Sequence, residues 1–137
     1  MTSAGMTAAE LHTSIATAAE AGVVVDGAES GELPTGLPAH LGGRGGGWAP
    51  EDLYAAALAS CLHQTVVRMA ASGGHSTTGS SVSAAVGLRH DGAERLDFEV
   101  RFKVELPGVA DEAARRDLVD LSVSHCPMVG GWPVDVA

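Results

Sequence analysis

The chain is poor in aromatic residues, in positive charge and in cysteine. Phe, Trp and Tyr make up 4% of the 137 residues, so a core must be built mostly from Val, Leu and Ala. Eight Lys and Arg residues stand against 17 Asp and Glu residues, which gives a formal net charge of -9. This charge argues against a nucleic-acid-binding face and against anionic membrane surfaces. We therefore expect neither nucleic acid nor a membrane as a partner.

Long hydrophobic runs are also missing. No stretch approaches the roughly 20 apolar residues that span a bilayer, and the N-terminus lacks the basic start and apolar run of a signal peptide. The expected location is therefore the cytoplasm. With 45% hydrophobic and 18% charged residues, the composition is that of a folded protein. At this length we expect a single domain over residues 1–137.

The two cysteines lie in different local surroundings. Cys61 belongs to an apolar, helix-forming run, whereas Cys126 stands between His125 and Pro127. Cytoplasmic thiols are kept reduced at rest, so a bridge between them would be transient and catalytic or sensory. If the two meet in space, they form a reversible dithiol/disulfide pair. A static structural disulfide is the weaker alternative.

Apolar periodicity and turn residues predict hairpin, helix, hairpin, helix and a short tail, which is an α+β domain. The expected elements are strands over 11–17 and 22–26 with a turn at 26–27, a Gly- and Pro-rich connection over 30–47, a helix over 50–72, strands over 82–90 and 95–106 joined at 91–92, and a helix over 111–124. The three- and four-residue spacing in the first helix puts Cys61 on a buried or interfacial stripe. Inward positions of the second helix should be Ala114, Leu118 and Leu121.

Two segments resemble a known family. Leu41-Gly-Gly-Arg-Gly-Gly-Gly-Trp-Ala-Pro-Glu-Asp-Leu-Tyr-Ala-Ala-Ala-Leu-Ala-Ser-Cys-Leu-His63 is similar to the glycine loop and cysteine helix of the organic hydroperoxide resistance proteins, in the osmotically inducible protein C (OsmC) superfamily. His125-Cys126-Pro127 is similar to their second cysteine motif. The resemblance implies an intertwined homodimer with antiparallel sheets, a long central helix carrying the first cysteine and sites at the subunit interface. It also implies thiol-dependent reduction of organic hydroperoxides, with a dihydrolipoyl protein as reductant and no bound cofactor.

Thiol chemistry assigns the roles within this resemblance. A thiolate attacks the O–O bond and becomes a sulfenic acid, which a second thiol converts to a disulfide. Cys61 would attack and Cys126 would resolve. An apolar helix face around Cys61 would favour bulky organic hydroperoxides, because they gain about 25 cal/mol per Å² of apolar surface buried. The same apolar face raises the pKa of a thiol, so the site needs a cationic or hydrogen-bonding partner.

The chain departs from the family at its thiolate-stabilising pair. Glu51 matches the family's glutamate, but residues 15–26 contain no arginine where the family places one. Arg44 is the alternative cation, unless it is an ordinary solvated loop residue. Glu51 lies ten residues before Cys61, about 15 Å along a helix, so a partner chain or an intervening residue would have to bring it to the site. Its other role is that of an acid stabilising the helix N-terminus.

The remaining motifs favour no metal or phosphate site. His63 and Cys61 are two residues apart and so point to different faces of a helix, which makes them poor joint ligands. His125 is expected to cap the C-terminus of its helix. The cluster Gly42–Gly47 lacks the Gly-Lys-Ser/Thr ending of a phosphate loop. The alternative to a peroxidase is a divergent member of the superfamily that acts as a redox sensor or hydrophobic-ligand binder.

Overall fold

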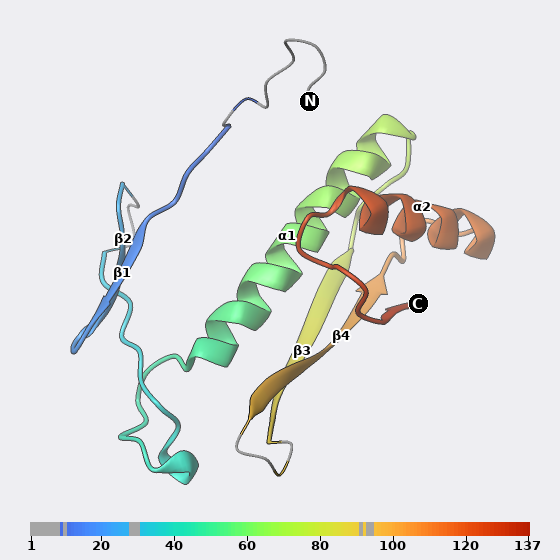
Figure 1. Cartoon of the computed structure of the whole chain (residues 1–137). Coiled ribbons are helices and arrows are strands. Elements are labelled where there is room, and N and C mark those ends of the chain that lie inside the picture. The colour runs from blue at the N-terminus through green and yellow to red at the C-terminus, as the bar shows by residue number, and fades with distance from the viewer. Residues whose placement is uncertain (1–8, 10, 28–30, 91, 93–94) are drawn as a thin grey trace, which may run out of the picture. The chain divides into compact units, whose positions relative to one another are not determined.

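The chain folds into helices and two antiparallel hairpins, which confirms the predicted α+β class. The computed structural model describes residues 9, 11–27, 31–90, 92 and 95–137 (Figure 1). The chain divides into two compact units, Met1–Ala49 and Pro50–Ala137. The single domain expected over residues 1–137 stays a prediction.

The first unit contains a short antiparallel hairpin. Strand β1 (Ala16–Ala19) pairs with strand β2 (Gly22–Val25). Because Ala19 pairs with Gly22, the hairpin loop consists of Glu20 and Ala21. The turn predicted at residues 26–27 follows β2 instead of closing the hairpin, so that position was wrong. The predicted first strand also began too early.

The glycine-rich segment of the first unit makes close backbone contacts. A 3-10 helix, η1 (Ala39–Leu41), interrupts it, and a bridge between Thr35 and Trp48 ties its two ends together. A Cβ atom on Gly43 would overlap the Leu37 carbonyl. Glycine is therefore needed here because two backbone segments approach each other.

The second unit begins with the long helix α1 (Pro50–Ser72), whose bounds match the prediction. Proline suits the first helical position, and Glu51 and Asp52 complement the positive end of the helix dipole. The helix ends where Gly74 adopts φ +73° and the His75 N–H donates to the Ala70 carbonyl over 2.9 Å, as in a Schellman cap. Among the described residues, no helix is long and apolar enough to cross a membrane.

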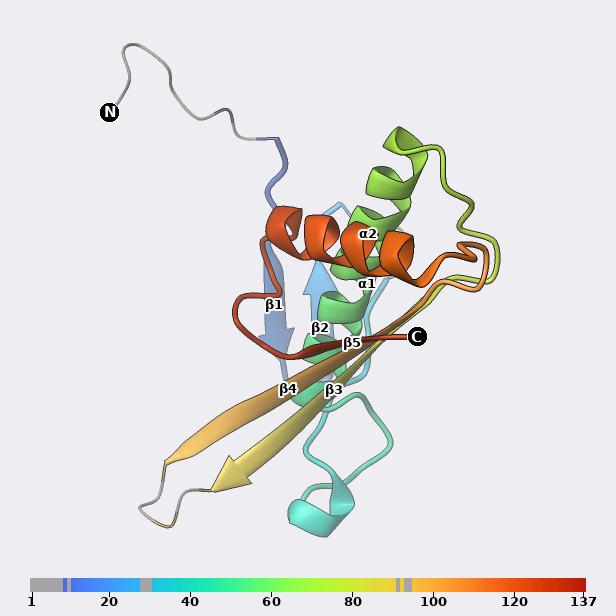
Figure 2. The ribbon, with the colours of Figure 1, turned by 90° about the vertical axis from the view of Figure 1, so that its right-hand side faces the viewer.

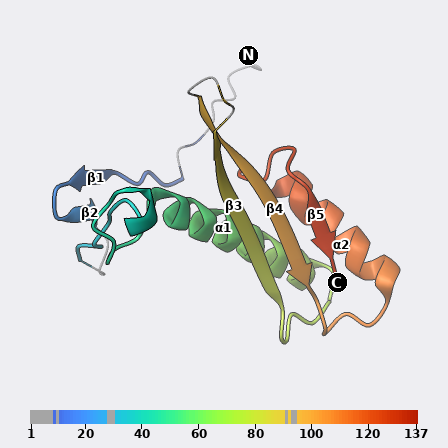
Figure 3. The ribbon, with the colours of Figure 1, turned by 90° about the horizontal axis from the view of Figure 1, so that it is seen from below.

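A three-stranded sheet packs against α1. Strand β3 (Ser81–His90) pairs antiparallel with β4 (Leu96–Glu105), from Ser81–Glu105 to His90–Leu96. The sequence analysis missed the third strand, β5 (Val134–Val136), which runs parallel to β4 in the tail. Figure 3 shows the three strands side by side with β4 in the middle. Of the predicted β3–β4 turn, residue 91 lies outside the described residues.

Buried and exposed residues alternate along β4, and the buried ones form part of the core. Val100, Phe102 and Val104 are buried, and the residues between them are exposed, as expected for a strand with one face on the core. They pack with one stripe of α1, which consists of Leu58, Leu62, Val66 and Ala70.

Helix α2 (Glu112–His125) completes the core of this unit, and Figure 2 shows it crossing α1. Its start is capped by the Asp111 side chain, which accepts the Ala114 N–H over 3.0 Å. Leu118 is buried as predicted, but Leu121 is 46% exposed and Ser122 is buried in its place. Ser122 is accommodated because its Oγ donates to the Leu118 carbonyl over 2.7 Å. Packing of α2 on α1 brings the C-terminal end of α2 to the middle of α1.

Candidate active site

The structure brings the two cysteines together. The Cys126 Sγ lies 3.3 Å from the Cys61 Sγ and donates a hydrogen bond to it. Both cysteines are free thiols, and a covalent bond would need the sulfurs to approach to about 2.05 Å. The pair is therefore a reduced dithiol that can form a disulfide after a small movement.

Each cysteine owes its position to its local sequence. Cys61 lies midway along α1, beside the core stripe, and is half-buried. Cys126 follows the last residue of α2 with an extended backbone, φ −89° and ψ 116°. The ring of Pro127 disfavours the helical conformation at the preceding residue. The helix therefore ends at His125, and the chain turns so that the buried Cys126 faces α1.

The surroundings of Cys61 act on its pKa in both directions. Burial raises the pKa of the Cys61 thiol, and the neighbouring Cys126 raises it further. The backbone of Met128, through a hydrogen bond, and the positive charge of Arg68 lower that pKa. The net pKa lies above the ordinary value of a cysteine. The resting thiol is therefore mostly protonated at neutral pH, and a stronger positive or hydrogen-bonding influence would activate it.

A cavity of about 350 Å³ opens beside Cys61. Its lining residues come from α1 and from the end of α2, and they are Cys61, Gln64, Thr65, Arg68, His125 and Pro127. Four of these six side chains are polar or basic, whereas the sequence analysis expected an apolar lining. Gln64 and Arg68 follow Cys61 by three and seven residues, which places them near it on the helix surface.

The family comparison gives the same assignment as the cysteine motifs. The family model described as OsmC-like protein matches residues 43–130, more than half of the chain. The chain belongs to the OsmC-like protein family. The matched segment of this OsmC-like chain contains both cysteines and the whole of α1. A search of curated proteins found no match.

Solved structures similar to this OsmC-like chain show the same fold. An organic hydroperoxide resistance protein OsmC from Legionella pneumophila is 24% identical, with a TM-score of 0.79, and the match covers 93% of this chain and 97% of that chain. A structure from Vibrio cholerae, described as an organic hydroperoxide resistance protein with captopril in one of its active sites, is 24% identical, with a TM-score of 0.81 and 93% of each chain covered. A third structure is that of an organic hydroperoxide resistance protein from Elizabethkingia anophelis with thiocyanate bound. It is 26% identical, with a TM-score of 0.76, and the match covers 93% of this chain and 95% of that chain. The predicted resemblance to this superfamily is confirmed.

The two other predicted site residues lie apart from this dithiol along the OsmC-like chain. Glu51 is in the first turn of α1, and its Oε2 is buried without a hydrogen-bond partner among the described residues. Arg44 belongs to the first unit, where it lines a hollow of about 550 Å³ together with Glu20 and the glycine-rich segment. The roles of Glu51 and Arg44 stay predictions.

The histidines near the cysteines have separate partners. His63 Nε2 lies 3.0 Å from the Ser80 Oγ, just before β3. His125 Nδ1 lies 2.9 Å from the Leu121 carbonyl, so its N–H donates to the last turn of α2 and the predicted C-terminal cap is confirmed. Within the described part of this OsmC-like chain, no three His, Cys, Asp or Glu residues gather in a way that could hold a metal ion.

The sequence analysis missed Arg68 as a neighbour of Cys61. Helical spacing carried a signal, because residues seven apart lie almost on the same face of a helix. The resemblance to the family instead pointed to residues 15–26 for the cation, and Arg68 lies outside that segment. In this OsmC-like chain Arg68 is the basic residue of α1 that lines the Cys61 cavity.

Proposed function

We propose that this chain is a cysteine-based peroxidase that reduces organic hydroperoxides to alcohols, in the manner of a peroxiredoxin-like dithiol enzyme. The observation that supports the proposal most is the 3.3 Å approach of two free thiols at the edge of a cavity. Family membership and the names of structures with this fold agree with it. Cys61 is the nucleophile in the proposal because it lines the cavity, whereas Cys126 is 6% exposed.

The first half of the cycle is the attack of the Cys61 thiolate on the terminal oxygen of the hydroperoxide. The O–O bond breaks, sulfur gains one oxygen as a sulfenic acid, and the alkoxide leaves and takes a proton to become the alcohol. Sulfur is oxidised by two electrons and the peroxide is reduced by two. The geometry favours this step once Cys61 is a thiolate, because the cavity gives direct access to its sulfur.

The second half of the cycle is the condensation of the two cysteines. Cys126 attacks the Cys61 sulfur, the S–S bond forms, and the hydroxyl group leaves with a proton as water. Turnover then requires an external dithiol, for which we propose a dihydrolipoyl protein, and no bound cofactor. Because the sulfurs already lie 3.3 Å apart, little rearrangement of the helices is needed.

The proposal includes a homodimer in the cytoplasm with Glu51 and Arg44 at the site. Exposed apolar side chains of the second unit, such as Leu96 (62% exposed) and Phe98 (39%), would gain from a partner surface. In a dimer, a second chain can bring its Arg44 and Glu51 toward Cys61. Within one chain, Glu51 and Cys61 lie about 15 Å apart along α1. Measuring the Cys61 pKa in an Arg44→Ala variant tests this role, and an unchanged pKa removes Arg44 from the site.

The alternative is a redox sensor or hydrophobic-ligand binder with the same fold. The raised pKa of Cys61 favours it, because a thiol that is mostly protonated at neutral pH reacts slowly with peroxides. Such a protein would still form the Cys61–Cys126 disulfide, but slowly and with little selectivity among oxidants.

A stopped-flow experiment separates the two functions. Reduced protein is mixed with cumene hydroperoxide or hydrogen peroxide, and the product is identified by mass spectrometry. The peroxidase proposal expects fast oxidation that prefers the organic peroxide and ends in a Cys61–Cys126 disulfide. Cys61→Ser should not react, and Cys126→Ser should stop at the sulfenic acid. Slow oxidation that is indifferent to the peroxide would reject the peroxidase in favour of the sensor or binder.

A further inference from the structure

Arg68 is placed on α1 to act on the Cys61 sulfur. Seven residues separate the two, which is two helical turns less about 20°, so they share a face. Their Cα atoms are about 10.5 Å apart along the axis. Helical side chains lean toward the N-terminus, and an arginine at position 68 therefore leans back toward Cys61. The contact of both residues with one cavity agrees with this direction.

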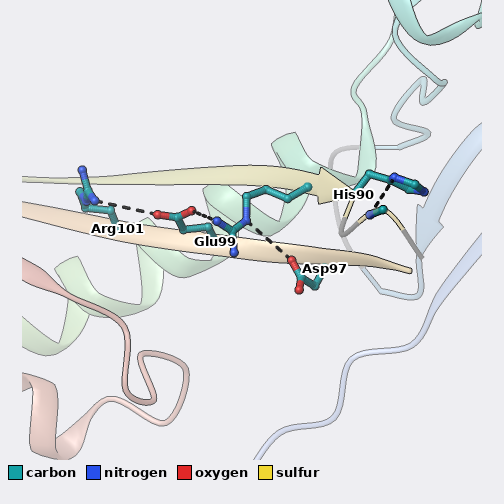
Figure 4. A network of polar contacts seen from close by, with 6 residues as sticks. His90, Asp97, Glu99 and Arg101 are labelled. Atoms are coloured by element: carbon teal, nitrogen blue, oxygen red, sulfur yellow. Dashed lines mark hydrogen bonds and ion pairs between the residues drawn. The ribbon is translucent and has the colours of Figure 1, made fainter. Parts of the chain in front are cut away.

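The charge of Arg68 is not neutralised by an acidic neighbour. Within the described residues, no carboxylate lies within ion-pair distance of Arg68, and none of the six side chains that line the cavity is acidic. The arginines of β3 and β4 behave differently. Arg89 lies 2.8 Å from a Glu99 oxygen and Arg101 lies 4.0 Å from the other (Figure 4). A carboxylate that pairs with an arginine cancels most of its field at a distance, so the Arg68 charge, although exposed to solvent, is not cancelled by such a pair.

The other groups that face Cys61 cannot supply a lasting positive charge. From α2 and the residue after it come His125 and Cys126. Cys126 becomes negative when it ionises, and His125 is charged only in its protonated form. A guanidinium keeps its positive charge throughout the physiological pH range. Arg68 is thus the permanent cation among the groups that face the thiol within the described residues.

We propose that Arg68 is a thiolate-stabilising residue of this protein, acting from within α1 on the Cys61 sulfur. This inference rests on the proposed function only for the later reaction of the thiolate with a hydroperoxide. The stabilisation of the thiolate does not depend on that function. It places the activating cation in the same helix as the nucleophile, two turns away. Burial and Cys126 raise the pKa of Cys61, and the positive charge of Arg68 lowers it in addition to the backbone hydrogen bond of Met128.

Alkylation of Cys61 by iodoacetamide tests the proposal without any peroxide. All variants carry Cys126→Ser, so that one thiol is followed, and the rate is measured from pH 6 to pH 10. In Arg68→Gln the midpoint of the profile should move to higher pH, and the rate at pH 7 should fall about two- to fivefold, as for a solvent-exposed ion pair. Arg68→Lys should retain most of the wild-type rate. Arg101→Gln, with the same loss of charge on β4, should leave the profile unchanged.

A charged reagent gives a second readout of the local field. Iodoacetate is negative, so its rate relative to iodoacetamide should be higher near a free cation and should fall in Arg68→Gln but not in Arg101→Gln. The proposal is overturned if Arg68→Gln matches Arg101→Gln in both measurements, or if Arg68→Lys changes the profile as much as Arg68→Gln does. A further outcome is that the variants respond to both alkylating reagents as expected while the protein shows no preference for the organic peroxide over hydrogen peroxide. That result would reject the peroxidase and leave the role of Arg68 intact.

Discussion

The arginines on the β3–β4 hairpin and the arginine beside Cys61 are used in opposite ways. On the hairpin, Arg89 contacts both Asp97 and Glu99, at 3.8 Å and 2.8 Å, on a face where these side chains are 47–62% exposed. Figure 4 shows this row of alternating charges along the strands. Beside Cys61, Arg68 lines a cavity with no acidic side chain in its lining. An arginine that is paired in water contributes little beyond solubility, whereas one facing a thiol can alter its reactivity.

The largest effect should come from the buried face of β4, directly beside the hairpin charges. Phe102 is fully buried in the core, so Phe102→Ala should lower the free energy of unfolding by about 3–5 kcal/mol. Its neighbour Arg101 lies on the opposite face, and Arg101→Gln should change the same quantity by less than about 0.5 kcal/mol. Urea denaturation of both variants measures the difference. Equal losses would mean that the two faces of β4 are not as distinct as the structure has them.

The next prediction concerns the pH dependence at Cys61. Because burial raises the pKa of this thiol, the protonated form dominates at neutral pH. The iodoacetamide rate at Cys61 should therefore increase about tenfold for each pH unit from 6 to 8. It should continue to increase above the pH at which an ordinary cysteine is ionised. Peptide mass spectrometry of the wild-type protein follows Cys61 separately from Cys126, and a rate that levels off below pH 7 would contradict the prediction.

A smaller effect is expected at the start of α2, the helix that carries Cys126 to the site. Asp111 accepts the Ala114 N–H over 3.0 Å, and Asp111→Ala should lower the free energy of unfolding by about 1 kcal/mol. Asp117→Ala is the matched control inside the same helix, where alanine is a better helix former, and it should not destabilise the protein. Thermal unfolding of the two variants distinguishes a cap from a simple loss of negative charge.

The smallest effect should be that of the hairpin ion pairs. Arg89→Gln removes contacts to Asp97 and Glu99 that are largely exposed, so the loss should be about 0.2–1 kcal/mol at low ionic strength. Salt screens such pairs, and the difference from wild type should shrink in 1 M NaCl. A loss that persists at high salt would show that Arg89 stabilises the hairpin through packing as well as through charge.

Most of the second unit could be predicted from local patterns. Pro50 followed by two acids, and the paired glycines Gly73 and Gly74, marked both ends of α1. Alternation along β4 was also a local property, and β4 lies within one residue of its expected bounds at each end. The parallel strand β5 was missed because three residues after Pro133 are too short to carry a periodic signal. The loop of the first hairpin was misplaced because a conventional Asp-Gly turn signal outweighed Glu20 and Ala21.

The sequence by itself determined that the core is built mostly from Val, Leu and Ala, the bounds of α1, the bounds of α2 to within one residue, and the helix end at His125 that Pro127 enforces. These features depend on backbone preference and periodicity within one element. Only the tertiary structure decided that two thiols 65 residues apart lie 3.3 Å from each other, and that Gln64, Arg68 and His125 share a cavity with one of them. Such contacts depend on how α2 packs across α1. Local sequence patterns do not encode this packing, because they identify the buried face of a helix but not the surface against which that face packs.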